Sequence, residues 1–115
     1  MRRGEIWQVD FEPAQGSEAN KRRPAVIVSN DRANATASRL GRGVLTVVPV
    51  TSNVDRVYPF QALLESPTTG LTVPSKAQAE QIRSVATQRL IRRVGHRSPA
   101  EYSALDEAIR MHLAL

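Results

Sequence analysis

Cysteine is absent from this chain of 115 residues. Its absence excludes a disulfide framework, a thiolate metal site and a cysteine nucleophile. Histidine occurs only at His96 and His112, and there is no HExxH motif, no P-loop, no GxGxxG and no close cluster of Asp and Glu suited to two-metal phosphate chemistry. If the chain is an enzyme, we therefore expect a metal-free mechanism that uses no cofactor.

Long apolar runs are also missing. None approaches the roughly 20 residues that a membrane-spanning helix needs. The beginning of the chain is basic, as in a signal peptide, but Glu5 and Asp10 interrupt any apolar segment that could follow. The hydrophobic fraction of 41% and the charged fraction of 23% are those of a globular protein. We expect a single domain over residues 1–115, located in the cytoplasm and without membrane contact.

Acidic residues are fewer than basic ones. Sixteen Lys and Arg residues against 11 Asp and Glu residues give a formal net charge of +5, and nearly all the basic residues are arginine. The planar guanidinium group can hold two phosphate oxygens at once, so this composition favours a polyanionic partner such as nucleic acid. A well-solvated arginine-rich surface is the alternative explanation.

Short β-branched runs alternate with polar stretches rich in glycine and proline. They predict strands at residues 5–11, 24–29, 44–51 and 60–64, further extended pieces at 71–73 and 80–86, a long polar loop at 12–20 and a brief helical turn at 30–39. In the continuous apolar run at 44–51, Pro49 indicates a bulge or an edge near the end of a central strand. Thr51 is therefore expected where this strand leaves the core, whereas Trp7 is expected to pack in the core.

The final predicted element is a helix. Ser98, Pro99 and Glu101 form a complete capping box with proline at the first helical position. An apolar stripe follows at spacings of three and four, while polar neighbours such as Asp106 are expected to face water. The stripe consists of Tyr102, Leu105, Ile109 and Leu113. His112, beside this stripe, suits a packing or interface role, and His96 is interpreted as part of a solvated basic turn with Arg92, Arg93 and Arg97. Several short strands closed by one helix indicate a small antiparallel sheet or a partly open barrel.

RNA can be cut without a metal, because its 2′-hydroxyl can attack the adjacent phosphate once aligned and relieved of its proton. A basic polar loop beside a hydroxyl at a strand end could supply these functions. The sequence contains such pieces in a defined order, namely Arg3-Gly4-Glu5-Ile6-Trp7, Gly16-Ser17-Glu18, Arg22-Arg23-Pro24-Ala25-Val26-Ile27-Val28, Val50-Thr51-Ser52-Asn53, Tyr58-Pro59-Phe60 and Glu80-Gln81-Ile82-Arg83.

This ordered set, which covers nearly the whole chain, resembles the MazF/PemK (Kid-like) family of toxin endoribonucleases. The resemblance implies an SH3-like small antiparallel barrel with a C-terminal helix, a homodimer, and cleavage of single-stranded RNA, mRNA in particular, to 2′,3′-cyclic phosphate and 5′-hydroxyl ends. It also implies a cognate acidic antitoxin whose disordered tail would fold into a positively charged groove.

The resemblance assigns three catalytic candidates. Arg23 matches the arginine before the proline, and because a guanidinium group barely deprotonates it would stabilise developing charge rather than act as a base. Thr51 matches a threonine that would hold a non-bridging phosphate oxygen. Glu18 is one candidate to accept the 2′-hydroxyl proton, although the base stays open.

Further residues would bind RNA. Ser17 matches the loop that borders the RNA groove, and Arg22 is expected to attract phosphate. Asn53 and Tyr58 are expected to touch bases, the tyrosine by stacking. Gln81 would read RNA and Arg83 would orient its neighbours or a phosphate, unless both are simply polar outward positions on a strand.

Two other functions stay open. A gyrase poison of the CcdB type shares the fold, but its activity depends on a C-terminal Trp-Gly-Ile, whereas this chain ends Leu113-Ala114-Leu115 and has its only tryptophan at position 7. The other is a non-catalytic RNA-binding module, which the basic charge supports equally well. The sequence identifies neither the bases that flank the cut nor the antitoxin.

Overall fold

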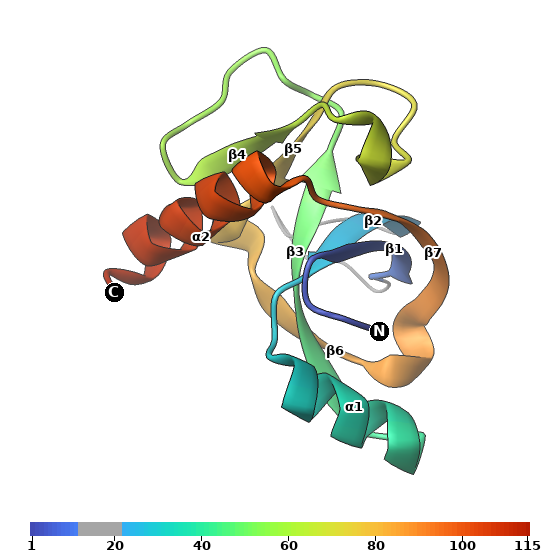
Figure 1. The fold of residues 1–115 in the computed structure, drawn as a ribbon. Coiled ribbons are helices and arrows are strands. Elements are labelled where there is room, and N and C mark those ends of the chain that lie inside the picture. Colours follow the sequence, from blue (N-terminus) through green and yellow to red (C-terminus); the bar gives the residue numbers. More distant parts are fainter. Residues whose placement is uncertain (12–21) are drawn as a thin grey trace.

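The computed structural model describes residues 1–11 and 22–115. In this part the chain forms one seven-stranded sheet, two α-helices and three short 3₁₀ turns (Figure 1). The elements are β1 (Glu5–Asp10), β2 (Arg22–Ile27), α1 (Asp31–Leu40), β3 (Val44–Thr51), β4 (Gln61–Leu64), η1 (Pro67–Thr69), β5 (Ser75–Gln78), η2 (Ala79–Gln81), β6 (Arg83–Ala86), η3 (Thr87–Arg89), β7 (Leu90–His96) and α2 (Pro99–Leu113).

Every strand pairing in the described sheet is antiparallel, in the order β4-β5-β3-β2-β1-β7, with β6 also paired to β3. The prediction of a small antiparallel sheet with a C-terminal helix is confirmed, and closure of the sheet into a barrel stays a prediction. β3 is the central strand, as its continuous apolar sequence indicated. It pairs with β6 up to Val47 and with β5 from Val50, so Pro49 lies where β3 changes partners.

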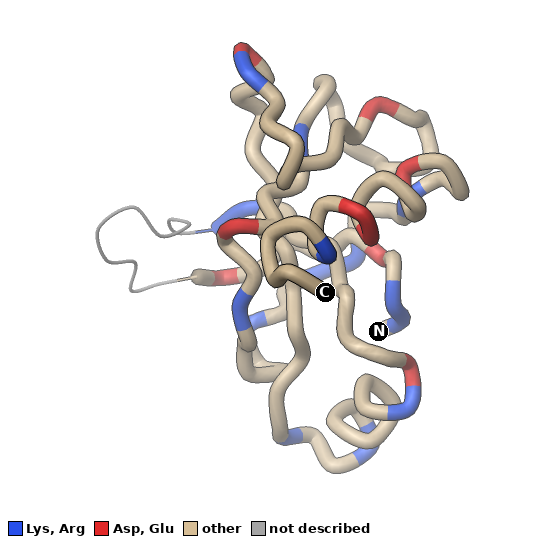
Figure 2. Tube along the Cα trace, turned by 90° about the vertical axis from the view of Figure 1, so that its left-hand side faces the viewer, with Lys and Arg blue, Asp and Glu red and all other residues tan. Residues whose placement is uncertain are grey.

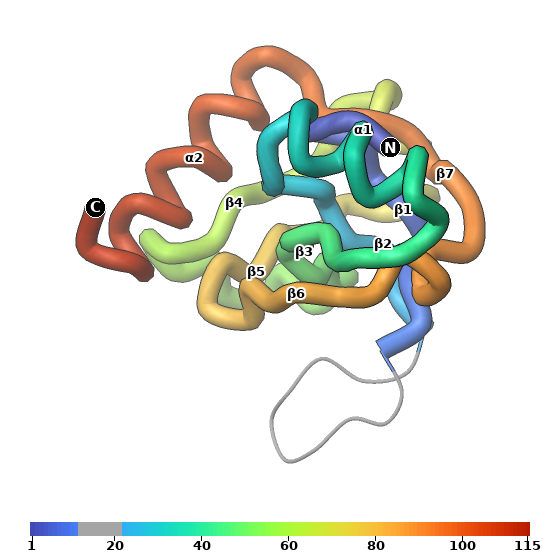
Figure 3. Tube along the Cα trace, turned by 90° about the horizontal axis from the view of Figure 1, so that it is seen from below, coloured from blue at the N-terminus to red at the C-terminus, as the bar shows by residue number. Residues whose placement is uncertain are grey.

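The central strands are buried on both faces. Val26 of β2 packs in a cluster with Leu105 of α2, whereas its neighbour Ala25 packs in a second cluster with Ala37 of α1. Figures 1 and 3 show the same division, with α2 beside β4 and α1 at the other end of the molecule. Two-sided burial explains why β3 reads as an unbroken apolar run, because both sets of alternating side chains are covered. Trp7 packs half-buried against the second cluster, which confirms its predicted packing role.

Most predicted elements are confirmed and some are wrong. The strands predicted at 5–11, 24–29, 44–51 and 60–64 are present apart from one or two residues at their ends. The brief helical turn at 30–39 is the full helix α1, capped by the Asn30 side chain. Residues 71–73 form no strand, and the strand in this region, β5, begins only after them. The piece predicted at 80–86 begins with η2 before β6.

The basic turn predicted around His96 is also wrong, because β7 runs through it. Arg97 is only 4% exposed, and its guanidinium carbon lies 3.7 Å from the centroid of the Tyr102 ring. Asp106, expected to face water, accepts a hydrogen bond of 2.9 Å from Arg3. These contacts join the beginning of the chain, the end of β7 and α2. Local periodicity cannot reveal them because the partners are far apart in the sequence.

Helix α2 begins as predicted. Ser98 and Glu101 form both hydrogen bonds of the capping box, and Leu105 is fully buried. The apolar stripe loses contact toward its end, where Leu113 is 46% exposed. His112 is exposed as well, so it does not pack in the core of this chain, and its interface role stays a prediction.

Glu101 also ties α2 to the segment after β4. Its carboxylate accepts hydrogen bonds from the main-chain N–H groups of Glu65 at 2.7 Å, Ser66 at 3.0 Å and Ser98 at 2.9 Å, and from the Ser66 hydroxyl at 2.8 Å. Partial burial alone would raise the pKa of Glu101, but these hydrogen bonds favour the charged form and lower the pKa to about 2.

We expect Glu101→Gln to lower the free energy of unfolding by about 1–2 kcal/mol at pH 7, since the neutral amide accepts these bonds more weakly. Because the pKa is lower in the folded state than its ordinary 4.5, the carboxylate's contribution is complete above pH 4.5 and is lost as the pH falls toward 2. Urea unfolding of both proteins from pH 7 to pH 3 measures this. A difference between them that stays constant over that range would contradict it.

Candidate functional site

Arg23 and Thr51 are placed together by strand pairing. Ala25 of β2 lies opposite Pro49 of β3 in an antiparallel register. Directly opposite residues project their side chains from the same face of a sheet, and alternate residues of a strand share a face, so Arg23 and Thr51 lie on one face. Both residues line the same hollow. The two principal candidates from the sequence therefore line one hollow at the end of the central strand.

The same face carries further cations. Thr51 is paired with Lys76 of β5, and Val47 is paired with Arg83 of β6. Val47, Pro49 and Thr51 are alternate residues of β3. Since alternate residues of a strand share a face, register places Arg23, Lys76 and Arg83 on one face of the sheet around Thr51.

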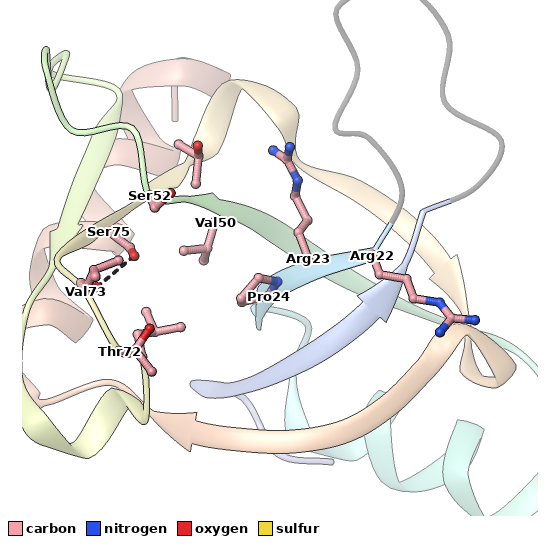
Figure 4. A pocket seen from close by; sticks show the side chains of 10 residues that line it. Arg22, Arg23, Pro24, Val50, Ser52, Thr72, Val73 and Ser75 are labelled. Carbon is pink, nitrogen blue, oxygen red and sulfur yellow. Dashed lines mark hydrogen bonds between the residues drawn. The ribbon is translucent and has the colours of Figure 1, made fainter.

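The hollow beside Arg23 has a volume of about 350 Å³. Its walls include Pro24, Val50, Val73 and Ser75. Figure 4 shows that these side chains gather on one side, whereas Arg23 projects away from them. The guanidinium group therefore stands at the rim of the hollow rather than at its floor.

Arg22 and Arg23 differ in their surroundings. Arg22 is exposed and points in the opposite direction from the half-buried Arg23, as strand alternation requires (Figure 4). Among the described residues, no hydrogen bond or ion pair engages the Arg23 guanidinium. Its donors are consequently available to an anion in this part of the structure. Figure 2 shows basic positions at the beginning of β2, with acidic and basic positions intermixed over the remaining trace.

Thr51 ends β3 in a tight polar turn. Its hydroxyl oxygen accepts a hydrogen bond from the main-chain N–H of Asn53 at 3.3 Å, and the Asn53 side-chain oxygen accepts one from Asp55 at 3.2 Å. A hydroxyl that accepts one bond can still donate its own hydrogen to a phosphate oxygen. Asn53 is exposed two residues after Thr51, and its predicted contact with RNA stays a prediction.

Tyr58 lies in the β3–β4 loop (residues 52–60) and is 41% exposed. Its ring is stacked on Phe60, with centroids 5.2 Å apart and planes within 3°. The guanidinium of Arg56 lies 5.5 Å from the ring centroid and donates to the Tyr58 hydroxyl at 3.3 Å. An exposed aromatic ring bordered by a cation has the chemical character of a stacking platform for a base.

Two residues that the sequence did not single out hold this loop. Gln61 accepts the Tyr58 main-chain N–H at 3.1 Å and donates to the carboxylate of Glu80 at 2.7 Å. Lys76 donates to the main-chain oxygen of Arg56 at 2.5 Å. Gln61 was visible only as a polar residue in a strand, and Lys76 falls in a strand that the sequence pattern missed.

Gln81 and Arg83 line a second hollow of about 360 Å³ together with Glu80, Ile82 and Ser84. The Arg83 guanidinium lies 5.4 Å from the Phe11 ring centroid. Arg83 therefore shares the face of Arg23 but not its hollow. Gln81 belongs to the 3₁₀ turn η2 rather than to an outward strand position.

Ser17 and Glu18 lie outside the described residues, so their predicted roles stay predictions. Among residues 1–11 and 22–115, no three His, Asp or Glu side chains are grouped so that they could hold a metal ion. No helix in this part is long and apolar enough to cross a membrane.

Known proteins of one family are similar to this chain in sequence and in fold. The family described as "PemK-like, MazF-like toxin of type II toxin-antitoxin system" matches residues 2–113. "Endoribonuclease MazF9" of Mycobacterium tuberculosis is 71% identical over 115 residues, which are 100% of this chain and 98% of that protein.

Solved structures show the same fold. The crystal structure of MazF (Form-I) from Deinococcus radiodurans has a TM-score of 0.82 at 22% identity and covers 100% of this chain and 97% of its own. A mycobacterial endoribonuclease in complex with its cognate antitoxin has a TM-score of 0.79 at 21% identity, with coverage of 100% and 96%. From its sequence and its fold, this chain belongs to the PemK/MazF family of toxins of type II toxin–antitoxin systems.

Proposed function

We propose that this chain is an endoribonuclease toxin that cleaves single-stranded RNA without a metal and leaves 2′,3′-cyclic phosphate and 5′-hydroxyl ends. The observation that supports the proposal is that Arg23 of β2 and Thr51 at the end of β3 line the same hollow. A cation and a hydroxyl on one face suit a phosphate whose negative charge increases during the reaction.

In the proposed reaction the 2′-oxygen of the RNA attacks the adjacent phosphorus and the bond to the 5′-oxygen breaks. The 2′-hydroxyl proton goes to a base, for which Glu18 is the candidate, and a proton must reach the departing 5′-oxygen. Arg23 stabilises the charge on the phosphorane, and because a guanidinium is protonated at neutral pH it can supply this proton but does not serve as the base. Thr51 donates to a non-bridging oxygen.

The neighbouring residues would hold the RNA on either side of the cut. Tyr58 stacks on a base and Asn53 contacts a base edge, since both are exposed in the β3–β4 loop. Gln81 and Arg83 would contact RNA at the second hollow. Arg22 attracts phosphate from the opposite side of β2, and the predicted RNA contact of Ser17 completes the set.

The proposed protein partners are a second copy of this chain and an acidic antitoxin. Met111, Leu113 and Leu115 are 59%, 46% and 83% exposed, which leaves apolar surface at the end of α2 for a homodimer. The net charge of +5 suits an acidic antitoxin tail, and a structural neighbour is complexed with its cognate antitoxin.

The deciding experiment is digestion of a long RNA by purified, antitoxin-free protein in EDTA, with both new ends mapped. Cleavage leaving 5′-hydroxyl ends is the expected result. Tight RNA binding without cleavage would support the non-catalytic module instead, and inhibition of DNA gyrase without RNA cleavage would support the CcdB-type activity.

Thr51→Val should lower kcat about 10- to 100-fold, since it removes a hydrogen bond to a charged group and keeps the shape of the side chain. Thr51→Ser keeps the hydroxyl and should retain most of the activity. Single-turnover cleavage of a defined oligonucleotide compares the three proteins. If the valine and serine variants are equally impaired, the hydroxyl is not the functional group.

A further inference from the structure

Lys76 is a buried cation beside the proposed site. It is only 8% exposed, and it is paired across the ladder with Thr51, so the two side chains leave the same face of the sheet. Lysine is rarely buried, because removing an ammonium group from water costs free energy unless the group is hydrogen-bonded. The contacts of Lys76 therefore indicate what its burial achieves.

Those contacts belong to one segment, the β3–β4 loop. The Lys76 ammonium donates a hydrogen bond of 2.5 Å to the main-chain oxygen of Arg56 and lies 5.9 Å from the centroid of the Tyr58 ring. Among the described residues, no carboxylate forms an ion pair with it. Its charge is thus directed at a loop carbonyl and an aromatic ring instead of an acidic partner.

The loop needs such a contact because little else in the described structure ties it to the sheet. Gln61 holds the Tyr58 main-chain N–H, and this anchor lies at the end of the loop next to β4. Lys76 holds the middle of the loop at Arg56, from the strand that is paired with Thr51. Lys76 therefore links the part of the loop that carries the Tyr58 ring to the end of β3.

We infer that Lys76 is a positioning residue that holds the β3–β4 loop so that Tyr58 presents its ring to RNA next to Thr51. This inference rests on the proposed endoribonuclease function. Lys76 acts through Tyr58 and not by touching the RNA, because the lysine is 8% exposed whereas the tyrosine is 41% exposed.

The test compares Lys76→Met, which keeps the unbranched apolar stem and loses the donor, with Arg42→Met. Arg42 is exposed just before β3, at the opposite end of that strand from Thr51, so its variant matches the loss of one charge. We expect Lys76→Met to lower kcat/KM on a short RNA about 10- to 100-fold, mainly through KM, as misplacement of a binding group does. Arg42→Met should stay close to wild type.

Two further measurements separate positioning from direct contact. In a Tyr58→Ala background, Lys76→Met should have little additional effect, because residues that act through one another are non-additive. Amide hydrogen exchange of residues 52–60 should be faster in Lys76→Met, while exchange in β2 and β3 stays unchanged, which also shows that the variant is folded.

Several outcomes would overturn the inference. An unchanged KM in Lys76→Met would show that the loop does not need the lysine, and a full additional loss in the Tyr58→Ala background would mean that Lys76 contacts RNA itself. If the wild-type protein cleaves no RNA, the proposed function fails, and the exchange measurement alone decides whether Lys76 holds the loop.

Discussion

Replacement of Arg23 by alanine is expected to slow RNA cleavage in EDTA by about 10²–10³-fold, with most of the loss in kcat. This side chain lines the same hollow as Thr51, and no described residue engages its guanidinium. A group that mainly stabilises charge developing in the transition state contributes to kcat more than to binding. Single-turnover rates of the wild type and the variant on the same oligonucleotide measure the effect.

The matched control for this variant is Arg22→Ala. Arg22 is the adjacent residue, it carries the same charge, and it points away from Arg23 (Figure 4). Loss of a phosphate-attracting charge should mainly raise KM and should make it less dependent on salt. If Arg23→Ala cuts RNA as fast as wild type, or if the two variants have the same profile, the mechanism proposed for Arg23 is wrong.

Gly95→Ala should lower the free energy of unfolding by about 3 kcal/mol or more, through overpacking against main-chain atoms. A Cβ atom at Gly95 would lie 2.3 Å from the main-chain oxygen of Thr69 and 2.5 Å from that of Thr68. These atoms belong to η1, which crosses β7 at this point, so the neighbours cannot turn aside as a flexible side chain would. Urea or thermal unfolding measures the loss.

Gly41→Ala provides the comparison. Gly41 caps α1 with a φ of +66°, and a Cβ atom there would meet nothing within 4 Å. This variant should lose only about 1 kcal/mol, the ordinary cost of a left-handed backbone conformation for alanine. Equal losses in the two variants would contradict the proposed close contact between β7 and η1.

Local sequence patterns are enough to predict several features of this protein. The capping box from Ser98 to Glu101 determines where α2 begins, because its two hydrogen bonds form within one turn. The β-branched run at 44–51 predicts a central strand, since its alternate residues are covered on both faces. The ordered motifs around Arg23 and Thr51 identify the family, and in the fold the two residues line one hollow.

Other features depend on residues that are distant in the sequence. β5 was missed because Ser75, Lys76 and Gln78 are polar, although the strand is held between β3 and β4. β7 was missed because two exposed arginines interrupt its apolar residues, while its pairing with β1 comes from the other end of the chain.

The surroundings of the proposed site also combine features that the local sequence predicts with features that depend on distant residues. Thr51 could be predicted as a strand-end hydroxyl, since the apolar run of β3 ends there. That Lys76 lies across from it and reaches Arg56 and Tyr58 was decided by the register of β3 and β5. Register is set by the burial of whole strands, and moving a strand by one residue would send every side chain to the other face. The sequence by itself determined the family and the candidate residues for its chemistry, whereas the tertiary structure decided which cation is paired with Thr51 and contacts the loop beside it.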